Sequence, residues 1–139
     1  MAQKCYDWAL VFLRLAVGIV FTAHGCQKLF TFGIPGVTGF LQGMGLPLPG
    51  LFAWILSLTE FGGGLLLLFG LFTRVAALFI AIAMAVAIMQ VHLPNGFFLP
   101  QGMEQALSLF LSAIALILAG AGKLSLDAMV FKKKQPTTT

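Results

Sequence analysis

The chain has 139 residues, of which 60% are hydrophobic and 9% are charged, and its mean hydropathy is +1.02. Soluble domains carry about 25% charged residues, so this composition excludes an ordinary soluble protein and predicts an integral membrane protein. The formal net charge is +4, but the basic residues form no groove-sized patch, so nucleic-acid binding is not expected.

Four apolar runs predict an all-α fold, an integral membrane bundle of four transmembrane helices in a single domain, residues 1–139. With its flanks, each run approaches the ~20 residues that a helix needs to cross a ~30 Å hydrocarbon core. A basic tail at 131–139 follows the last run and is expected to be flexible. The predicted spans are about 7–30, 51–73, 75–92 and 104–122.

The segment TFGIPGVTGFLQGMGLPLPG, residues 31–50, separates the first two runs and is dense in glycine and proline. These residues interrupt helices, so the segment is expected to be a loop. Its apolar side chains predict that this loop lies on the membrane or folds back onto the bundle.

The positions of the basic residues predict the orientation of the chain. Lys4 precedes the first run, Arg74 joins the second and third, and four lysines follow the last run. The loop joining runs 3 and 4 has no Lys or Arg, and the loop joining runs 1 and 2 has only Lys28 at its edge. The positive-inside rule therefore places both termini in the cytoplasm. The alternative that run 1 is a cleaved signal peptide is disfavoured, because Arg14 interrupts its apolar core.

Small residues predict where the helices touch. Ala77, Ala81 and Ala85 recur every four residues on one face, and Gly18 and Gly25 recur at seven-residue spacing on the first helix. Such residues allow the backbones of membrane helices to approach closely. The run GGG at 62–64 indicates either tight packing or a local weakness in the second helix.

Ionisable residues within the apolar runs need a partner or a cavity, because their insertion into the membrane is costly. Arg14, His24 and Lys28 fall within an arc of roughly 80° on the first helix. Glu60, in the second helix, is the only acid predicted to lie in the middle of the membrane. An Arg14–Glu60 ion pair is the first prediction for its partner, with His24 as the second candidate.

Two further polar groups are expected at the ends of the bundle. The inner group contains Arg74, Lys123 and Asp127. The outer group gathers side chains from the first, third and fourth helices, which meet only if the bundle closes. Its members are His24, Gln27, Lys28, Gln90, His92 and Glu104. The candidate ligand-binding residues are Arg14, His24, Lys28, Glu60, Gln90 and His92.

Other interpretations of the same residues stay open. Ion pairs involving Arg14, Glu60, Arg74 and Asp127 could be purely structural. A metal site is not predicted, because no H-x-x-x-H spacing occurs, although metal binding by His24, His92 and Glu104 remains undecided. A transporter would be expected to show paired half-helices or inverted repeats, and neither is visible in the sequence.

Motifs along the chain resemble the DoxX family of small four-helix membrane proteins. An arginine in the first helix is followed by FTAHGCQKL, TEFGGGLLLLFGLFTRVAAL, AMAVAIMQVH and GAGKLSLD. The resemblance covers about residues 11–127. Recurrent polar positions of the family correspond here to Arg14, His24, Lys28, Glu60, Arg74 and Asp127.

The resemblance implies a bacterial-type cytoplasmic (inner) membrane protein associated with redox processes or oxidative stress, with a quinone as the expected ligand and a redox protein or a second copy as partner. Combined with the polar residues, it predicts a subunit that binds a quinone or similar molecule in an intramembrane pocket. In that hypothesis His24 and Glu60 exchange protons or hydrogen bonds with the ring, Arg14 holds Glu60 ionised, and the glycine-rich second helix opens a lateral groove. The alternative is a non-catalytic assembly protein with a structural ion pair. Whether the chain is an enzyme stays undecided.

Overall fold

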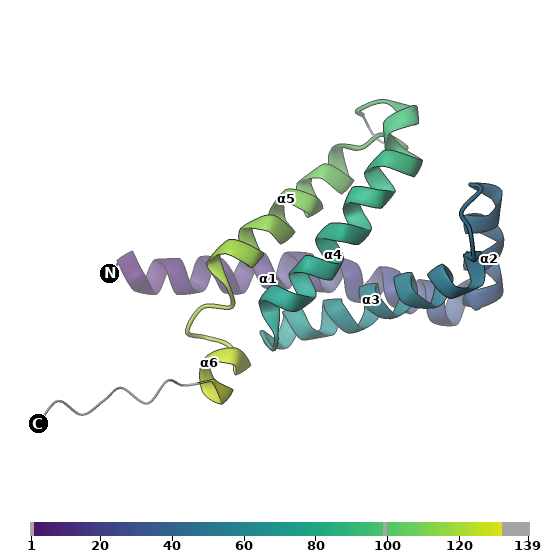
Figure 1. Ribbon diagram of the computed structural model, residues 1–139. Coiled ribbons are helices and arrows are strands. Elements are labelled where there is room, and N and C mark those ends of the chain that lie inside the picture. The colour runs from purple at the N-terminus through teal and green to yellow at the C-terminus, as the bar shows by residue number, and fades with distance from the viewer. Residues whose placement is uncertain (1, 99, 132–139) are drawn as a thin grey trace, which may run out of the picture.

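The computed structural model describes residues 2–98 and 100–131, and every regular element in these ranges is helical (Figure 1). The all-α prediction is therefore confirmed. The first helix, α1 (Ala2–Cys26), continues directly into a π-helical turn, η1 (Gln27–Thr31). The elements that follow are α2 (Gly33–Gly43), α3 (Pro49–Phe69), α4 (Thr73–Ala87), the π-helical turn η2 (Ile88–His92), the short 3₁₀ turn η3 (Leu93–Asn95), α5 (Glu104–Ala119) and α6 (Leu126–Val130).

Three helical segments are long and apolar enough to cross a membrane, and they are Ala2–Thr31, Pro49–Phe69 and Thr73–Asn95. The fourth apolar helix, α5, has 16 residues and is therefore about 24 Å long at 1.5 Å per residue. The described chain is thus an apolar helical bundle with three long helices and one shorter helix. Spanning by all four helices remains a prediction. The predicted flexible tail lies outside the described residues from position 132 onward.

The segment between the first two runs is not a loop over its whole length, because Gly33–Gly43 forms the helix α2. Its buried residues Val37 and Leu41 lie one turn apart and pack with Ala53 of α3 in a small separate core. Burial of an apolar stripe against a neighbouring helix stabilises a helix more than intrinsic propensity does. This tertiary contact explains why the glycines and the proline did not prevent helix formation. The expectation that the segment folds back onto the bundle is confirmed.

Helices α1 and α3 run antiparallel and are in contact through glycines on both helices. A Cβ atom on Gly25 would lie 2.2 Å from the backbone nitrogen of Phe61, and one on Gly64 would lie 2.4 Å from that of Thr22. Further along, Gly18 approaches Leu68 and the carbonyl of Gly64. The predicted close packing through small residues is confirmed for both Gly18 and Gly25. These contacts fix the register of the two helices, since no side chain separates their backbones.

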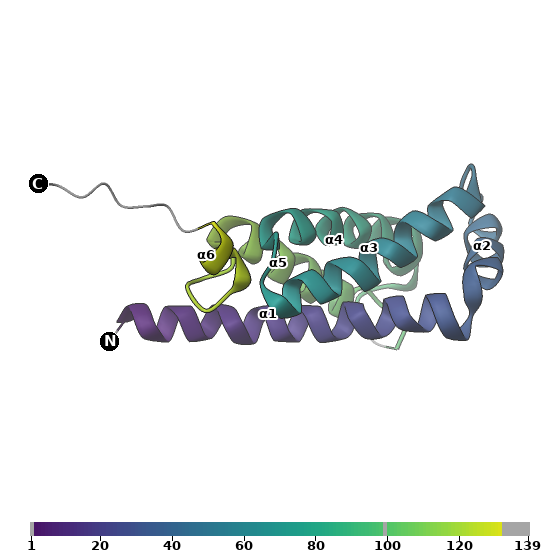
Figure 2. The same cartoon turned by 90° about the horizontal axis from the view of Figure 1, so that it is seen from below.

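Helices α4 and α5 form the second pair and lie at an angle to α1 and α3 (Figures 1 and 2). Ala77 and Ala81 are buried in the main apolar core, as their spacing predicted, together with Ile80 between them. Val17 and Phe21 of α1 reach the same core. Figure 1 shows the two helix pairs diverging from the end near α6 toward the end near α2.

The last described residues close the end of the bundle where α1 begins. The backbone N–H of Lys123 donates to Oδ1 of Asp7 over 3.3 Å, which attaches the loop before α6 to α1. The backbone N–H of Asp127 donates to the carbonyl of Gly70 over 2.8 Å, which attaches α6 to the turn between α3 and α4. These hydrogen bonds hold the helices together at this end, whereas the two helix pairs diverge toward α2 (Figure 1).

The GGG run provides a matched test of the α1–α3 contact. Gly64→Ala would force a methyl group into the backbone of α1, and overpacking of this kind costs about 1–3 kcal/mol. We expect a clearly lower midpoint of thermal unfolding for the purified protein in detergent. Gly62→Ala is the control, because a Cβ there meets nothing within 4 Å. Equal effects of the two substitutions would contradict the packing described here.

Candidate functional site

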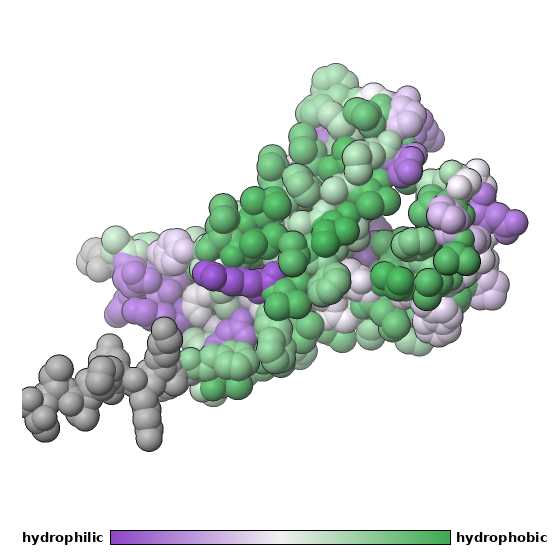
Figure 3. Space-filling model, viewed as in Figure 1, coloured by the Kyte–Doolittle hydropathy of each residue, from purple (hydrophilic) through white to green (hydrophobic). Residues whose placement is uncertain are grey.

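A cavity of about 580 Å³ lies between the two helix pairs, on the side of the core toward α2. Ligand pockets in proteins commonly measure about 300–1,000 Å³, so the cavity is large enough for a small organic molecule. Figure 3 shows this part of the molecule hollowed. The hollow lies between the end of α4 with the start of α5 on one side, and α2 with the start of α3 on the other. Most of the wall is apolar. The polar side chains that line it are those of His24, Lys28, Thr59, Glu60, Gln90, His92 and Gln105.

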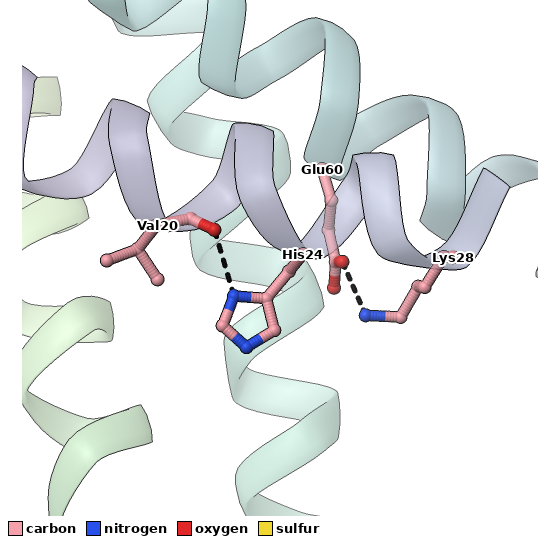
Figure 4. Close-up of polar contacts among 4 residues, drawn as sticks. All are labelled: Val20, His24, Lys28 and Glu60. Atoms are coloured by element: carbon pink, nitrogen blue, oxygen red, sulfur yellow. Dashed lines mark hydrogen bonds and ion pairs between the residues drawn. The ribbon is translucent and has the colours of Figure 1, made fainter. Parts of the chain in front are cut away.

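Glu60 forms an ion pair with Lys28 at the wall of this cavity (Figure 4). The Nζ atom of Lys28 donates to Oε2 of Glu60 over 2.5 Å. Glu60 is 3% exposed, so its charge needs a partner at this depth. The predicted Arg14–Glu60 ion pair is therefore wrong, because Lys28 occupies the position expected for Arg14.

The error arises from the packing register, which the sequence did not give. Residues counted along each predicted helix at ~1.5 Å per residue place Glu60 at a membrane depth between those of Arg14 and His24. The contact of Gly25 with Phe61 instead brings the residue before Phe61 next to the turn after Gly25, where Lys28 lies.

Arg14 lies in the middle of α1, outside the cavity, and is 3% exposed. Its Nη2 atom donates to the carbonyl of Leu124 over 2.5 Å. Its Nη1 atom lies 1.6 Å from the place that a Cβ on Gly70 would occupy. Gly70 also has a left-handed backbone, with φ of 66°, so this position requires glycine on two grounds. Arg14 is thus a structural residue that ties α1 to the loop before α6.

Asp127 and Arg74 also bond to backbone groups rather than to each other. The carboxylate of Asp127 accepts hydrogen bonds from the backbone N–H groups of Phe72 and Thr73 over 2.7 and 2.9 Å, at the start of α4. A carboxylate there satisfies N–H groups that have no partner within the helix. Arg74 donates to the carbonyl of Leu118, near the end of α5, over 3.2 Å. The inner polar group therefore joins three helices through their termini.

Both histidines are oriented by backbone carbonyl groups. The Nδ1 atom of His24 lies 2.8 Å from the carbonyl oxygen of Val20, one turn earlier in α1 (Figure 4). The Nδ1 atom of His92 lies 3.1 Å from the carbonyl oxygen of Gln101. His24 and His92 belong to different walls of the same cavity, so one ligand could contact both rings.

Of the six candidate ligand-binding residues, five line one cavity and Arg14 does not. The five are His24, Lys28, Glu60, Gln90 and His92. Two other members of the predicted outer group, Gln27 and Glu104, are not among the lining residues. The predicted lateral groove is also not formed by the GGG run, because the α3 residues at the cavity are Phe52, Ile55, Leu56, Thr59 and Glu60.

Sequence reasoning missed two parts of the site. The first is the wall that α2 contributes through Phe40 and Leu41, with Met44 just after it, because the segment was expected to be a loop. The second is the pair of π-helical turns, η1 and η2, which carry Lys28 in one case and Gln90 and His92 in the other. Such turns frequently occur at functional sites, but they have no sequence signature that could have been recognised. Gln105, at the start of α5, was visible as a polar residue but was not selected.

No metal centre is formed by the part of the chain that the structure describes. Across residues 2–98 and 100–131, no three His, Cys, Asp or Glu side chains lie close enough to one another to hold an ion.

The fold and the cavity define a small helical membrane protein with a polar pocket among apolar helices. The DoxX family profile matches residues 9–93, which is more than half of the chain, and the chain therefore belongs to the DoxX family. The match includes α1, α3, α4 and the polar residues of both π-helical turns. No solved structure gives a significant match.

Three relatives show how far the similarity extends. A Bacillus subtilis protein named "Putative oxidoreductase CatD" is 34% identical over 96% of this chain and 95% of its own length. The Mycobacterium tuberculosis protein named "Uncharacterized membrane protein Rv3486" is 35% identical over 90% of this chain and 83% of its own. "Inner membrane protein YqjF" of Escherichia coli is 37% identical over 57% of this chain and 58% of its own. The family and the three long apolar helices identify an integral membrane protein, and a bacterial inner-membrane location is consistent with these relatives.

Substitutions can test which residue is the partner of Glu60. Glu60→Gln leaves the charge of Lys28 without a counter-ion, and Lys28→Met leaves the charge of Glu60 without one. Breaking a buried ion pair in this way lowers the free energy of unfolding by about 3–5 kcal/mol. Because Lys28 is partly exposed, we expect the lower end of this range. The Lys28→Met/Glu60→Gln double variant should lose less stability than the sum of the single variants, as measured by thermal unfolding.

The matched control is the Arg14→Met/Glu60→Gln pair. Since Arg14 bonds to Leu124 and lies outside the cavity, its effect should add to that of Glu60→Gln within about 0.5 kcal/mol. If the effects of Arg14→Met and Glu60→Gln were non-additive while those of Lys28→Met and Glu60→Gln were additive, the result would support the Arg14–Glu60 pair instead.

Proposed function

We propose that this protein is a membrane subunit associated with redox chemistry that binds a quinone, or a similar small redox-active ring, in the cavity lined by Glu60 and His24. One observation carries the proposal: five polar residues singled out from the sequence line one largely apolar cavity. A ring with polar oxygens requires this combination, because apolar walls accommodate the ring and a few polar groups orient it.

Glu60 and His24 are the groups proposed to contact the ring oxygens. Figure 4 shows the Glu60 side chain descending from α3 between His24 and Lys28 of the first helical segment. Lys28, rather than Arg14, is the cation that stabilises the carboxylate of Glu60. The histidine and the carboxylate are both able to exchange protons with a ligand.

Membrane access also supports the proposal. The cavity opens between helix pairs whose outward surfaces carry large apolar side chains, among them Phe52 and Phe79, which line the cavity as well. A lipid-soluble ring could therefore enter from the hydrocarbon layer. The name of the Bacillus subtilis relative, which contains the word oxidoreductase, agrees with a redox role for this chain.

An assembly or interaction protein without a small-molecule ligand is the second candidate. Lys28 and Glu60 neutralise each other within the chain, so the pair needs no ligand to explain it. In that case a redox protein or a second copy of the chain would bind the exposed apolar faces. The two candidates differ in their response to Glu60→Gln, as set out next.

Ligand binding separates the two functions. A short-chain ubiquinone or menaquinone analogue, in its reduced and in its oxidised form, is titrated into the purified protein, and bound ligand is measured by equilibrium dialysis. We expect binding of the reduced form that weakens about tenfold in Glu60→Gln or His24→Ala, since the first weakens and the second removes an acceptor for a ring O–H group. The control is Gln27→Ala, on the same helical segment but not at the cavity. Absence of binding, together with a loss of stability in Glu60→Gln, would favour the assembly protein.

We further propose that both termini lie in the cytoplasm. The first turn of α1 and α6 lie at the same end of the bundle, opposite α2 (Figure 1). The basic residues Lys4, Arg74 and Lys123 gather toward this end, and the positive-inside rule assigns it to the cytoplasm. The cavity would then lie toward the outer half of the membrane.

The two exposed cysteines provide a test of this orientation. In a Cys26→Ser variant, Cys5 should react with a membrane-impermeant maleimide only after spheroplasts are permeabilised. In a variant with both cysteines replaced by serine, Asn95→Cys should react in intact spheroplasts, because Asn95 lies in the turn after η2 at the opposite end. Labelling of Cys5 in intact spheroplasts would reverse the orientation.

A further inference from the structure

We propose that the cavity selects the reduced, dihydroxy form of its ring ligand over the oxidised, dicarbonyl form, because its two histidines present hydrogen-bond acceptors. This inference rests on the proposed function, which assigns a redox-active ring to the cavity. It adds the redox state that the site favours and the residues that favour it.

The backbone determines which nitrogen of each histidine carries a proton. A carbonyl oxygen can only accept a hydrogen bond, so Nδ1 of His24 donates to Val20 and Nδ1 of His92 donates to Gln101. In a neutral imidazole the other nitrogen is then unprotonated and acts as an acceptor. Both histidines therefore offer Nε2 as an acceptor by the same arrangement.

These acceptors belong to different walls of one cavity. His24 lies on α1 and His92 on η2, and both line the space between the helix pairs. In Figure 4 the second ring nitrogen of His24 points away from the backbone of α1, on the side of the helix toward which Glu60 extends. Oε2 of Glu60 accepts from Lys28, and no side chain in the described part of the chain donates to Oε1. The site thus contains three acceptor atoms without a donor of their own.

The donors at the cavity do not outweigh these acceptors. Lys28 retains N–H groups beyond the one directed at Glu60, and these would favour a carbonyl oxygen. Thr59, Gln90 and Gln105 each carry a hydroxyl or amide group that both donates and accepts, so they serve either form of the ligand. The site therefore sets three acceptors against the two remaining N–H groups of Lys28.

The two forms of the ring differ in what they offer to such a site. A dihydroxy ring carries two O–H donors, which can satisfy two acceptors at once. A dicarbonyl ring carries acceptors only, so it leaves the acceptors that it contacts without a donor and covers them from water, which is costly. Selective binding of the reduced form raises the midpoint potential of the bound couple, by about 30 mV for a tenfold preference in a two-electron couple.

The test compares tetramethyl-1,4-benzoquinone with its hydroquinone, which differ only by two hydrogens, and with the dimethyl ether of that hydroquinone, which has the same ring and no O–H donor. Binding to the purified protein is measured by anaerobic equilibrium dialysis. We expect the hydroquinone to bind about tenfold more tightly than the quinone or the ether.

His24→Asn and His92→Asn remove Nε2 while keeping a side-chain N–H near the position of Nδ1, so each should reduce the preference severalfold. His24→Gln retains an amide oxygen and should restore part of it. Gln27→Ala is the control and should leave the preference unchanged. Folding of each variant is verified by its thermal midpoint, which should change little because both histidines are at least partly exposed.

The possible outcomes distinguish this inference from the proposed function. Equal binding of quinone and hydroquinone, or tighter binding of the quinone, would overturn the preference and leave ring binding in place. A preference that persists in both asparagine variants would overturn the assignment to the histidines. Absence of binding by all three compounds would overturn the proposed function and the inference with it.

Discussion

The close contact between α1 and α3 is the constraint on which the rest of the structure depends. Gly25 and Gly64 leave no room for a side chain between the two backbones, so neither helix can slide along the other without a steric clash. This register brings Lys28 against Glu60 near one end of the pair and Arg14 against Gly70 near the other. Two charged groups that would be costly within a membrane thereby acquire partners, an ion pair in one case and a backbone carbonyl in the other.

The two ends of the bundle have different roles as a result. At the end near α6, hydrogen bonds join the helices to one another. Asp7 and Arg14 tie α1 to the loop after α5. Arg74 ties α4 to α5, and Asp127 ties α6 to the turn between α3 and α4. At the end near α2, the helix pairs diverge and leave the cavity. Polar side chains at the first end therefore make structural bonds to backbone groups. Most of those at the second line a space that a ligand can fill.

The sequence predicted the composition of this site better than its geometry. Ionisable residues in apolar runs are conspicuous, and His24, Lys28, Glu60, Gln90 and His92 were all selected for that reason. Arg14 was selected on the same ground, but it lies at the structural end. The partner of Glu60 could not be deduced, because it depends on how two helices are displaced along each other. Arg14 and Lys28 are about four helical turns apart on the first helical segment, so the register decides which cation meets Glu60. The contribution of α2 to the cavity wall was missed because its glycines and proline predicted a loop, although Val37 and Leu41 form an apolar stripe that is buried against α3.

The sequence by itself determined the all-helical class, the membrane environment and the small residues that allow close helix contacts, because hydropathy and side-chain size are local properties. The tertiary structure alone decided that Lys28 pairs with Glu60 and that a cavity forms between diverging helix pairs. It also decided that the carbonyls of Val20 and Gln101 set the protonated nitrogen of each histidine. These features arise from register, crossing angle and the conformation of turns, which depend on contacts between residues far apart in the chain.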